Sequence, residues 1–261
     1  MTVALRGARV LLTGATGGLG HAIAHALHAR GASLVLTGRQ ADVLGPLAAE
    51  LSATPVVADL SDPAAVGAVV EQSGDVDVLV ANAALPSTGM LEDFDEADLD
   101  RQLDVNLRAP IVLAHALLPS MVARGRGQVV MIGSVSGLVA SPGSAMYNAS
   151  KFGLRGFAGG LRQDLHGTGV GVSLVMPGFV RDAGMFAKSG MVLPPGVRTV
   201  SPQQVADAVA RAIEKDQGEV VVAPAELRLG AKFGQLAPGI NAAIQRRAGA
   251  ADIVGGHQGG N

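Results

Sequence analysis

One tyrosine and one lysine offer the clearest acid–base chemistry in this 261-residue chain. Tyr147 is the only tyrosine, and Lys151 follows it by four residues, after Pro142 and Gly143, where the pattern turns helical. Residues four apart stand on one helix face, so an ammonium beside the phenol is expected to lower its pKa from about 10 by roughly one to three units. The phenol would then exchange a proton near neutral pH, as a general acid or base requires. A surface tyrosine with an unrelated lysine fits the same spacing.

Ser134 and Asn106 are the other candidates for the reaction. Ser134 follows an apolar, strand-like run, and its hydroxyl could hold a substrate oxygen beside the phenol. Asn106 lies four residues before Pro110 in a long helical pattern over residues 96–121. Proline has no N–H, so the Asn106 carbonyl loses its helical partner and could hold a water that carries protons to Lys151. A simple kink, with Asn106 only structural, is the alternative.

A glycine-rich turn near the N-terminus has the layout of a phosphate site. Residues 14–20 (GATGGLG) lie between a β-type run at 8–13 and a helical pattern that stops at Gly31. Strand, glycine turn and helix bring a pyrophosphate against backbone N–H groups at a helix N-terminus. Glycine lacks the Cβ that would block this approach. The pattern predicts a dinucleotide site.

Arg39, after a second strand at residues 33–37, indicates which dinucleotide binds. An acidic side chain at this point would accept hydrogen bonds from the ribose hydroxyls, whereas a planar guanidinium suits a 2′-phosphate. The sequence therefore favours NADP(H), with NAD(H) possible; a solvent-facing arginine is the alternative. Asp59, after a third strand, could meet the exocyclic amine of adenine, or it could cap the next helix, a role that Ser61 or Asp62 could take instead.

Alternating strands and helices predict the fold class: α/β, a doubly wound parallel sheet of Rossmann type with right-handed crossovers. Further strands are expected at residues 55–58, 76–80, 128–132 and 219–222, and helices at 41–51, 63–72 and 201–215. With 48% hydrophobic residues, a chain of this length can form one domain. We expect a single domain over residues 1–248, a substrate flap at about 183–199 and a disordered tail at 249–261.

Composition excludes several classes of function. The formal charge is −2, there is no basic run, and 3% of residues are aromatic, so no nucleic-acid partner is expected. The absence of cysteine excludes disulfides and thiolate sites. His21, His25 and His28 read as a solvated stripe rather than a metal site. The N-terminus does not read as a signal peptide and no apolar run reaches the length of a membrane span, so a cytoplasmic protein without an integral membrane segment is expected.

In order and spacing, the motifs resemble the short-chain dehydrogenase/reductase family over about residues 8–222. The match rests on Thr13-Gly14-x-x-x-Gly18-x-Gly20, Asp59, Asn82, Asn106, Ser134, Tyr147-x-x-x-Lys151 and Pro177-Gly178. The resemblance implies that Tyr147 is the general acid/base and that Lys151 lowers its pKa and binds the nicotinamide ribose. It also implies that Ser134 polarises the substrate oxygen and that Asn106 holds a relay water. The implied cofactor contacts are Gly14, Thr16, Gly18, Leu19, Gly20, Arg39, Asp59, Leu60, Asn82, Tyr147, Lys151, Pro177 and Gly178.

The activity that this resemblance implies is NADP-dependent interconversion of a secondary alcohol and a ketone, in a homodimer or homotetramer often built from the two long helices beside the site. Apolar residues of the expected flap, together with Leu138, Ala140 and Met146, suggest an apolar substrate, although packing explains them equally well. Two positions depart from the family pattern. Ala84 stands where many members have glycine, and Asp182 where many have a threonine that contacts the nicotinamide carboxamide.

Alternatives remain for the function and for the C-terminal region. A non-catalytic NAD(P)-binding sensor or scaffold could use the same fold, as could an isomerase or lyase. Residues 231–247 read as a broken amphipathic helix for subunit contact or, as the less favoured alternative, peripheral membrane contact.

Overall fold

A seven-stranded parallel sheet forms the centre of the protein. The computed structural model describes residues 2–183 and 198–247, and the strands in that part of the chain are ordered β3-β2-β1-β4-β5-β6-β7. Every neighbouring pair is parallel. The strands are β1 (Arg9–Thr13), β2 (Ser33–Gly38), β3 (Thr54–Val57), β4 (Val78–Ala81), β5 (Gly127–Ile132), β6 (Val170–Pro177) and β7 (Glu219–Val222).

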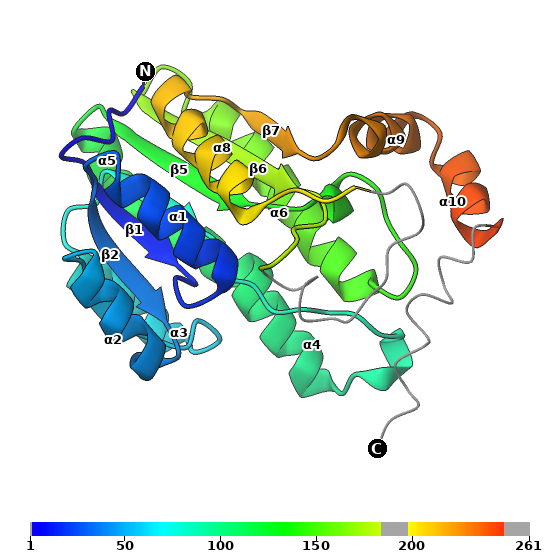
Figure 1. Ribbon diagram of the computed structural model, residues 1–261, viewed down its shortest axis with the longest axis horizontal. Helices are drawn as coiled ribbons and strands as arrows, with labels where there is room; N and C mark the ends of the chain where they lie inside the picture. Colours follow the sequence, from blue (N-terminus) through cyan, green and yellow to red (C-terminus); the bar gives the residue numbers. More distant parts are fainter. Residues whose placement is uncertain (1, 184–197, 248–261) are drawn as a thin grey trace.

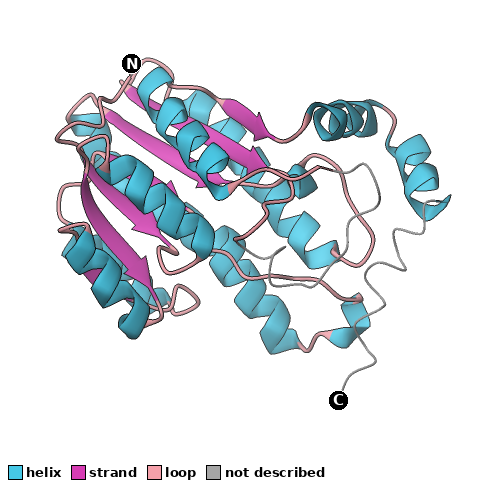
Figure 2. Ribbon diagram, viewed as in Figure 1, coloured by secondary structure: helices cyan, strands magenta, loops and turns pink. Residues whose placement is uncertain are grey.

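Helices cover both faces of this sheet (Figures 1 and 2). One face carries α1 (Gly18–His28), α2 (Ala41–Glu50) and α8 (Pro202–Lys215). The other carries α3 (Pro63–Ser73), α5 (Ala109–Ala123) and α6 (Ala145–Asp164). The chain continues after β7 into α9 (Ala225–Leu236) and α10 (Pro238–Arg247).

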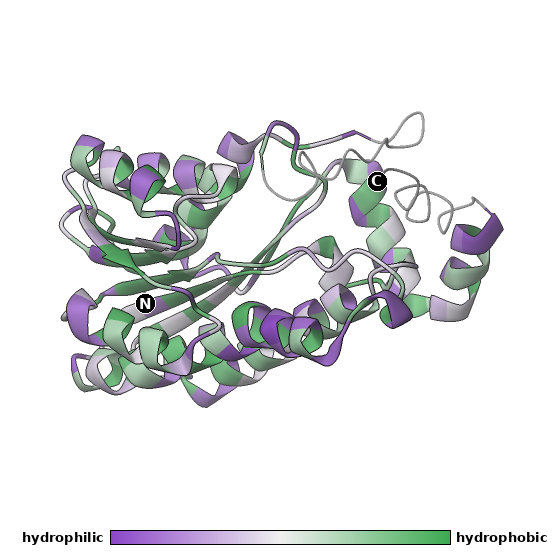
Figure 3. Cartoon of the chain, turned by 90° about the horizontal axis from the view of Figure 1, so that it is seen from below, coloured by the Kyte–Doolittle hydropathy of each residue, from purple (hydrophilic) through white to green (hydrophobic). Residues whose placement is uncertain are grey.

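The strands are apolar on both sides because both sides are covered. In β1, Val10 and Leu12 pack with α1, α2 and α8, while Leu11 packs with α3 and α5 on the opposite face. Successive strand residues point to opposite faces, so a strand buried on both sides reads as a continuous apolar run. Figure 3 shows these hydrophobic strands between two helical layers. The predicted α/β, doubly wound, single-domain fold is confirmed.

Element boundaries differ from the predicted ones mostly by one or two residues. The largest difference lies at the C-terminus, where the broken helix expected at 231–247 starts earlier, at Ala225. Its two parts are α9 and α10, and α10 starts at Pro238. Proline lacks an N–H and is best tolerated in the first turn of a helix, so the second helix begins there. The predicted flap, except Ala183, Arg198 and Thr199, and the predicted tail lie outside the described residues.

The long helical pattern before β5 is divided into three parts. They are α4 (Glu96–Leu103), a π-helical turn η2 (Asp104–Arg108) and α5, with Pro110 in the first turn of α5. By length and composition, residues 96–123 form the one helical run in the described chain that could cross a membrane, which corrects the expectation that no run was long enough. Leu113, Leu117 and Met121 of this run are buried against the sheet, so packing in the core accounts for its apolar character.

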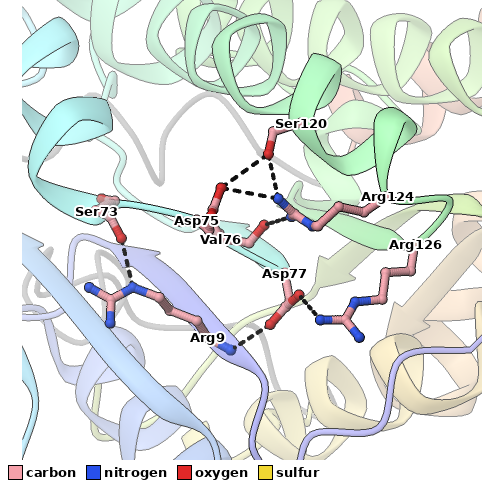
Figure 4. Close-up of polar contacts among 8 residues, drawn as sticks. All are labelled: Arg9, Ser73, Asp75, Val76, Asp77, Ser120, Arg124 and Arg126. Atoms are coloured by element: carbon pink, nitrogen blue, oxygen red, sulfur yellow. Dashed lines mark hydrogen bonds and ion pairs between the residues drawn. The ribbon is translucent and has the colours of Figure 1, made fainter.

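Polar contacts tie the helices to the amino-terminal edge of the sheet (Figure 4). The Arg9 side chain donates to the Ser73 carbonyl at 2.7 Å, and the Arg9 N–H donates to Asp77 at 3.0 Å. Arg124, at the end of α5, donates to the Val76 carbonyl at 2.7 Å. These contacts join α3 and α5 to the starts of β1 and β4, at the edge opposite the predicted site.

Candidate active site

The carboxyl ends of the strands bring the predicted site residues to one edge of the sheet. The strand order changes direction between β1 and β4, which is where doubly wound sheets bind ligands. The glycine turn follows β1, and the ends of the next five strands are followed by Arg39, Asp59, Asn82, Ser134 and Gly178.

Ser134 and Tyr147 come together beside the end of β5. Ser134 caps a short 3₁₀ helix, η3 (Val135–Gly137), and its Oγ accepts the Ser136 N–H at 3.1 Å. Tyr147 lies in the first turn of α6, and its phenol is hydrogen-bonded to the Ser134 side chain. The structure therefore places these two hydroxyl groups side by side, and a shared substrate oxygen stays a prediction.

Lys151 lies beneath the phenol, one turn further along α6. Its side chain is buried, its Nζ donates to the Ile132 carbonyl at 3.0 Å, and the same Nζ is 5.6 Å from the centre of the Tyr147 ring. Burial lowers the pKa of Lys151 from 10.5 to about 8. Gly137 permits this packing, because a Cβ there would lie 2.7 Å from the Lys151 carbonyl oxygen.

The pKa of Tyr147 moves in the direction opposite to the predicted one. Burial raises it above the ordinary 10.0, and the hydrogen bond with Ser134 offsets this only in part. A buried site disfavours the charged form of each group, so the phenol and the ammonium both shift towards neutrality. The Lys151 ammonium also donates to Ile132 rather than to the phenol. Tyr147 therefore stays protonated at neutral pH, as a proton donor must be.

Asn106 is buried in the π-helical turn η2, and its side chain holds the loop after β4. Its Nδ2 donates to the Leu85 carbonyl at 3.0 Å, and its Oδ1 accepts the Leu85 N–H at 2.6 Å. The sequence did not predict this clamp, which joins residues 21 positions apart. Because η2 packs against α6, Asn106 lies in a turn beside the helix of Lys151. A relay water at its carbonyl stays a prediction.

The glycine turn leaves the start of α1 open to an anion. Gly17 is the N-cap of α1 and has no side chain to bond the N–H groups of the first turn. Gly14 has a φ of +67°, and a Cβ there would lie 2.7 Å from the Ala83 Cα. A Cβ at Gly20 would collide with the Gly14 carbonyl. The glycines are thus required for the turn to close against β4 and α1.

Asn82 and Thr13 fix this turn to the end of β4. The Asn82 side chain donates to the carbonyls of Thr13 (3.0 Å) and Gly14 (3.1 Å). The N–H groups of Asn82 and Ala83 both donate to the Thr13 hydroxyl, each at 3.0 Å. The structure thus gives Asn82 a role in shaping the loop, while a direct contact with the cofactor stays a prediction.

Two more predicted cofactor contacts have packing roles. The Leu60 side chain is buried in the core, so a contact with a cofactor would come from its backbone. Gly178 donates its N–H to the Val222 carbonyl at 3.0 Å, and a Cβ there would lie 2.8 Å from Leu227 Cδ2. Gly178 therefore allows α9 to approach the end of β6.

Arg39 and Asp59 are neighbours at the ends of β2 and β3, and a second arginine joins them. Asp59 Oδ2 lies 2.8 Å from Arg101 and 3.7 Å from Arg39, whose side chain is half exposed. Asp59 Oδ1 accepts the N–H (3.0 Å) and hydroxyl (2.8 Å) of Ser61. Burial alone would raise the pKa of Asp59, but the Ser61 hydrogen bonds and the Arg101 charge outweigh it, so the pKa lies below 3.8.

Arg101 was not identified from the sequence, and it changes the expected pairing of Asp59 and Arg39. It occupies the Asp59 carboxylate more closely than Arg39 does, which leaves the Arg39 guanidinium available to an anionic ligand. Asp62, rather than Asp59, caps α3, with the Ala64 N–H at 2.9 Å. The alternative role of Asp59 as a helix cap is therefore excluded.

A phosphorylated dinucleotide fits these residues. Three features lie along one edge of the sheet. They are the uncapped N-terminus of α1, the glycine turn in which side chains at Gly14 and Gly20 would clash, and the half-exposed guanidinium of Arg39 after β2. Of the two departures, Ala84 is half-buried in the loop after β4, and Asp182 has a φ of +61° with a mostly exposed side chain 3.6 Å from Arg181. Leu138 is buried in the core, so packing explains that residue.

Comparisons with known proteins show the family of this chain. The short chain dehydrogenase family model matches residues 8–191. Ketoacyl reductase HetN of Nostoc sp. is 36% identical over 227 residues, covering 84% of this chain and 79% of that protein. Dehydrogenase/reductase SDR family member 7B of Bos taurus is 33% identical over 263 residues, covering 92% and 81%.

A solved structure shows the same likeness in three dimensions. The short-chain dehydrogenase from Sphingobium yanoikuyae in complex with NADPH has a TM-score of 0.78 and 26% identity, covering 91% of this chain and 95% of that one. The family match extends over most of the chain and includes the glycine turn, Ser134, Tyr147 and Lys151. The chain belongs to the short-chain dehydrogenase/reductase family of oxidoreductases, which bind NAD(P)(H).

Proposed function

We propose that this protein uses NADP(H) to interconvert a ketone and a secondary alcohol, with an apolar substrate. The observation that carries the proposal is the cluster of Ser134, Tyr147 and Lys151 at the carboxyl end of β5. A protein that only senses the dinucleotide needs the glycine turn but has no use for a half-buried phenol and a buried ammonium beside a serine. Two relatives, the ketoacyl reductase of Nostoc sp. and the NADPH complex, support the ketone and the cofactor respectively.

The substrate oxygen would lie between the Ser134 and Tyr147 hydroxyl groups. Ser134 donates a hydrogen bond to that oxygen and polarises the carbonyl. Tyr147 then passes its proton to the oxygen as negative charge develops there, which its raised pKa allows at neutral pH. The nicotinamide, when bound, supplies the hydride for the carbonyl carbon.

Lys151 stabilises the tyrosinate that remains after proton transfer. Its Nζ is 5.6 Å from the centre of the Tyr147 ring and is buried, so its charge acts with little screening by water. Asn106 would complete the proton path through a water at its carbonyl, and its side chain keeps η2 in place through Leu85.

Replacing the phenol tests this function. We expect Tyr147→Phe to lower the turnover of active ketones with NADPH by roughly 10²- to 10⁴-fold, because that is the usual contribution of a general acid. The rate is followed by absorbance of the reduced nicotinamide, on a panel of ketones. NADPH titration and circular dichroism serve as controls and should match the wild type. Turnover within a few-fold of the wild type would show that Tyr147 is not the proton donor.

A further inference from the structure

The last two helices hold a row of apolar side chains in solvent. Leu229, Phe233 and Leu236 on α9 are 68%, 46% and 87% exposed, and Ile240 and Ile244 on α10 are 58% and 53% exposed. We call residues 225–247 the C-terminal arm. Figure 1 shows the arm at the end of the molecule furthest from β2 and α2. Single exposed apolar residues are common, but several gathered on one element indicate an interaction surface.

The helix α9 is apolar on two opposite sides. Leu229, Phe233 and Leu236 are spaced by four and three residues and so share one face. Ala231 and Gly234 are buried on the other face. A large apolar face on a surface helix is expected to be covered. One side of α9 rests on the protein and the other remains uncovered.

The covered side rests on the loop between Ser134 and Tyr147. A Cβ at Gly234 would lie 2.8 Å from Val139 Cγ2, so α9 approaches this loop closely. On α10, Gln245 donates to the Ala140 carbonyl at 3.0 Å. The arm is therefore fixed to the loop that joins Ser134 to the helix of Tyr147, with its apolar ridge facing away.

The charge of the arm is opposite to that of the whole chain. The arm contains four cationic side chains and one acidic one, Glu226, which is paired with Arg198 at 2.8 Å, whereas the chain has a formal charge of −2. The cations are Arg228, Lys232, Arg246 and Arg247. At 100° per residue, Arg228 and Lys232 lie between the buried side of α9 and its exposed ridge. Arg228 also lines a surface pocket between α8 and β7 together with Arg198 and Arg211.

We propose that the C-terminal arm docks on an anionic lipid surface. An exposed apolar ridge bordered by Lys and Arg is the pattern of a helix that lies in a membrane interface, with the ridge in the acyl region and the cations at the phosphates. A second copy of this chain fits less well. In a symmetric contact the two arms would bring together the same cations, and the one carboxylate of each arm, Glu226, is already paired with Arg198.

Docking in this orientation would place α9 between the bilayer and the loop that joins Ser134 to Tyr147. The docking does not require the proposed reaction, so it can be tested by binding alone.

Sedimentation with lipid vesicles tests the arm in the full-length chain. We expect the wild type to bind vesicles of phosphatidylcholine with about one-quarter phosphatidylglycerol, to bind pure phosphatidylcholine far less, and to be released by salt. The combined variant Leu229→Ser, Phe233→Ser and Leu236→Ser should bind at least roughly tenfold more weakly. Arg228→Gln with Lys232→Gln should weaken binding by roughly ten- to thirtyfold.

A matched control changes exposed apolar residues elsewhere. Val57→Ser with Val122→Ser alters the end of the edge strand β3 and the end of α5, and should leave vesicle binding unchanged. Absence of binding by the wild type, or arm variants that bind as tightly as the wild type, would overturn the proposal. So would a lipid-free dimer that the serine variant abolishes, because a second copy would then cover the ridge.

Discussion

At the scale of single residues, burial rather than mutual attraction sets the protonation of Tyr147 and Lys151. The pKa of the Tyr147 phenol is raised above 10.0 and that of the Lys151 ammonium is lowered to about 8, although the two groups are close together. The sequence showed their spacing but not the depth at which they lie. At neutral pH this site holds a proton donor and a cation, which is the state needed to reduce a ketone.

The lysine pKa predicts a pH dependence for ketone reduction. Lys151 loses its charge as the pH rises through about 8, whereas Tyr147 keeps its proton there. We expect kcat/KM for reduction to be level below about pH 7 and to fall above about pH 8. Lys151→Arg, which remains protonated throughout, should show a lower rate without this fall. A profile that is level to pH 10 in the wild type would contradict this role.

Lys151 should also cost the protein stability at neutral pH. Its pKa is 10.5 in the unfolded chain and about 8 in the folded one, so between these values the unfolded state binds more protons and the free energy of unfolding rises with pH. We expect Lys151→Met to be inactive but more stable than the wild type by roughly 1–3 kcal/mol at about pH 7. The difference should shrink as the pH rises from 8 towards 10.5. Urea unfolding measures it, with the exposed Lys215→Met as control.

Arg39 should determine the choice of cofactor. A guanidinium contact with a 2′-phosphate is worth on the order of 1.5–3 kcal/mol, or roughly ten- to a hundredfold in affinity. Arg39→Ala should therefore weaken NADP binding by that factor and leave NAD binding unchanged, as measured by titration of each cofactor. Arg126→Ala, at the opposite edge (Figure 4), is the control. Equal losses for both cofactors would mean that Arg39 serves the fold.

A substitution at the neighbouring Gly38 is a poorer test of cofactor choice. Gly38→Asp would add a carboxylate to favour NAD, but its Cβ would lie 2.7 Å from Thr16 Cγ2. Such a change would disturb the glycine turn and affect both cofactors. Arg39→Ala alone gives the clearer result.

At the scale of helices and strands, the repeating apolar runs allowed the order and type of nearly every described element to be predicted. A parallel strand that is covered on both faces appears in the sequence as a continuous apolar run. The helices between the strands show apolar residues at a period of about 3.6 residues. The sequence predicted a kinked helix where the structure has a π-helical turn at Asp104–Arg108, because a wider backbone turn does not change the spacing of apolar side chains enough to be recognised. Arg101 pairs with Asp59, and Asn106 pairs with Leu85. Both pairings join residues that are distant in sequence and meet only in the folded protein, so the sequence pattern did not predict them.

Gly14 shows how the elements meet at the cofactor turn. Its φ of +67° disfavours any side chain, and a Cβ would press on the backbone of Ala83. We expect Gly14→Ala to lower the free energy of unfolding by about 1–3 kcal/mol and to weaken NADPH binding at least roughly tenfold. Thermal unfolding and titration measure the two effects. Gly45→Ala, in α2 with open space around its Cβ position, should be neutral or slightly stabilising.

At the scale of the whole molecule, the outer side of α6 is the surface where we predict that copies of this chain pair. Tyr147 and Lys151 face the site from this helix, and its other side exposes Ala149, Phe152 and Gly156. These three residues are spaced by three and four positions, and a Cβ at Gly156 would meet only open space. Two such faces could approach closely around Phe152, which fits the homodimer or homotetramer expected from the family.

The combined variant Phe152→Glu and Gly156→Glu tests this pairing. Carboxylates on both copies would repel each other across a symmetric contact, so sedimentation should shift from the oligomer to the monomer while circular dichroism stays unchanged. The arm variant with Leu229→Ser, Phe233→Ser and Leu236→Ser is the matched control and should keep the oligomer, because it alters a surface at the other end of the chain. A wild type that sediments as a monomer at working concentrations would remove the prediction. Loss of the oligomer only in the arm variant would move the contact from α6 to the C-terminal arm.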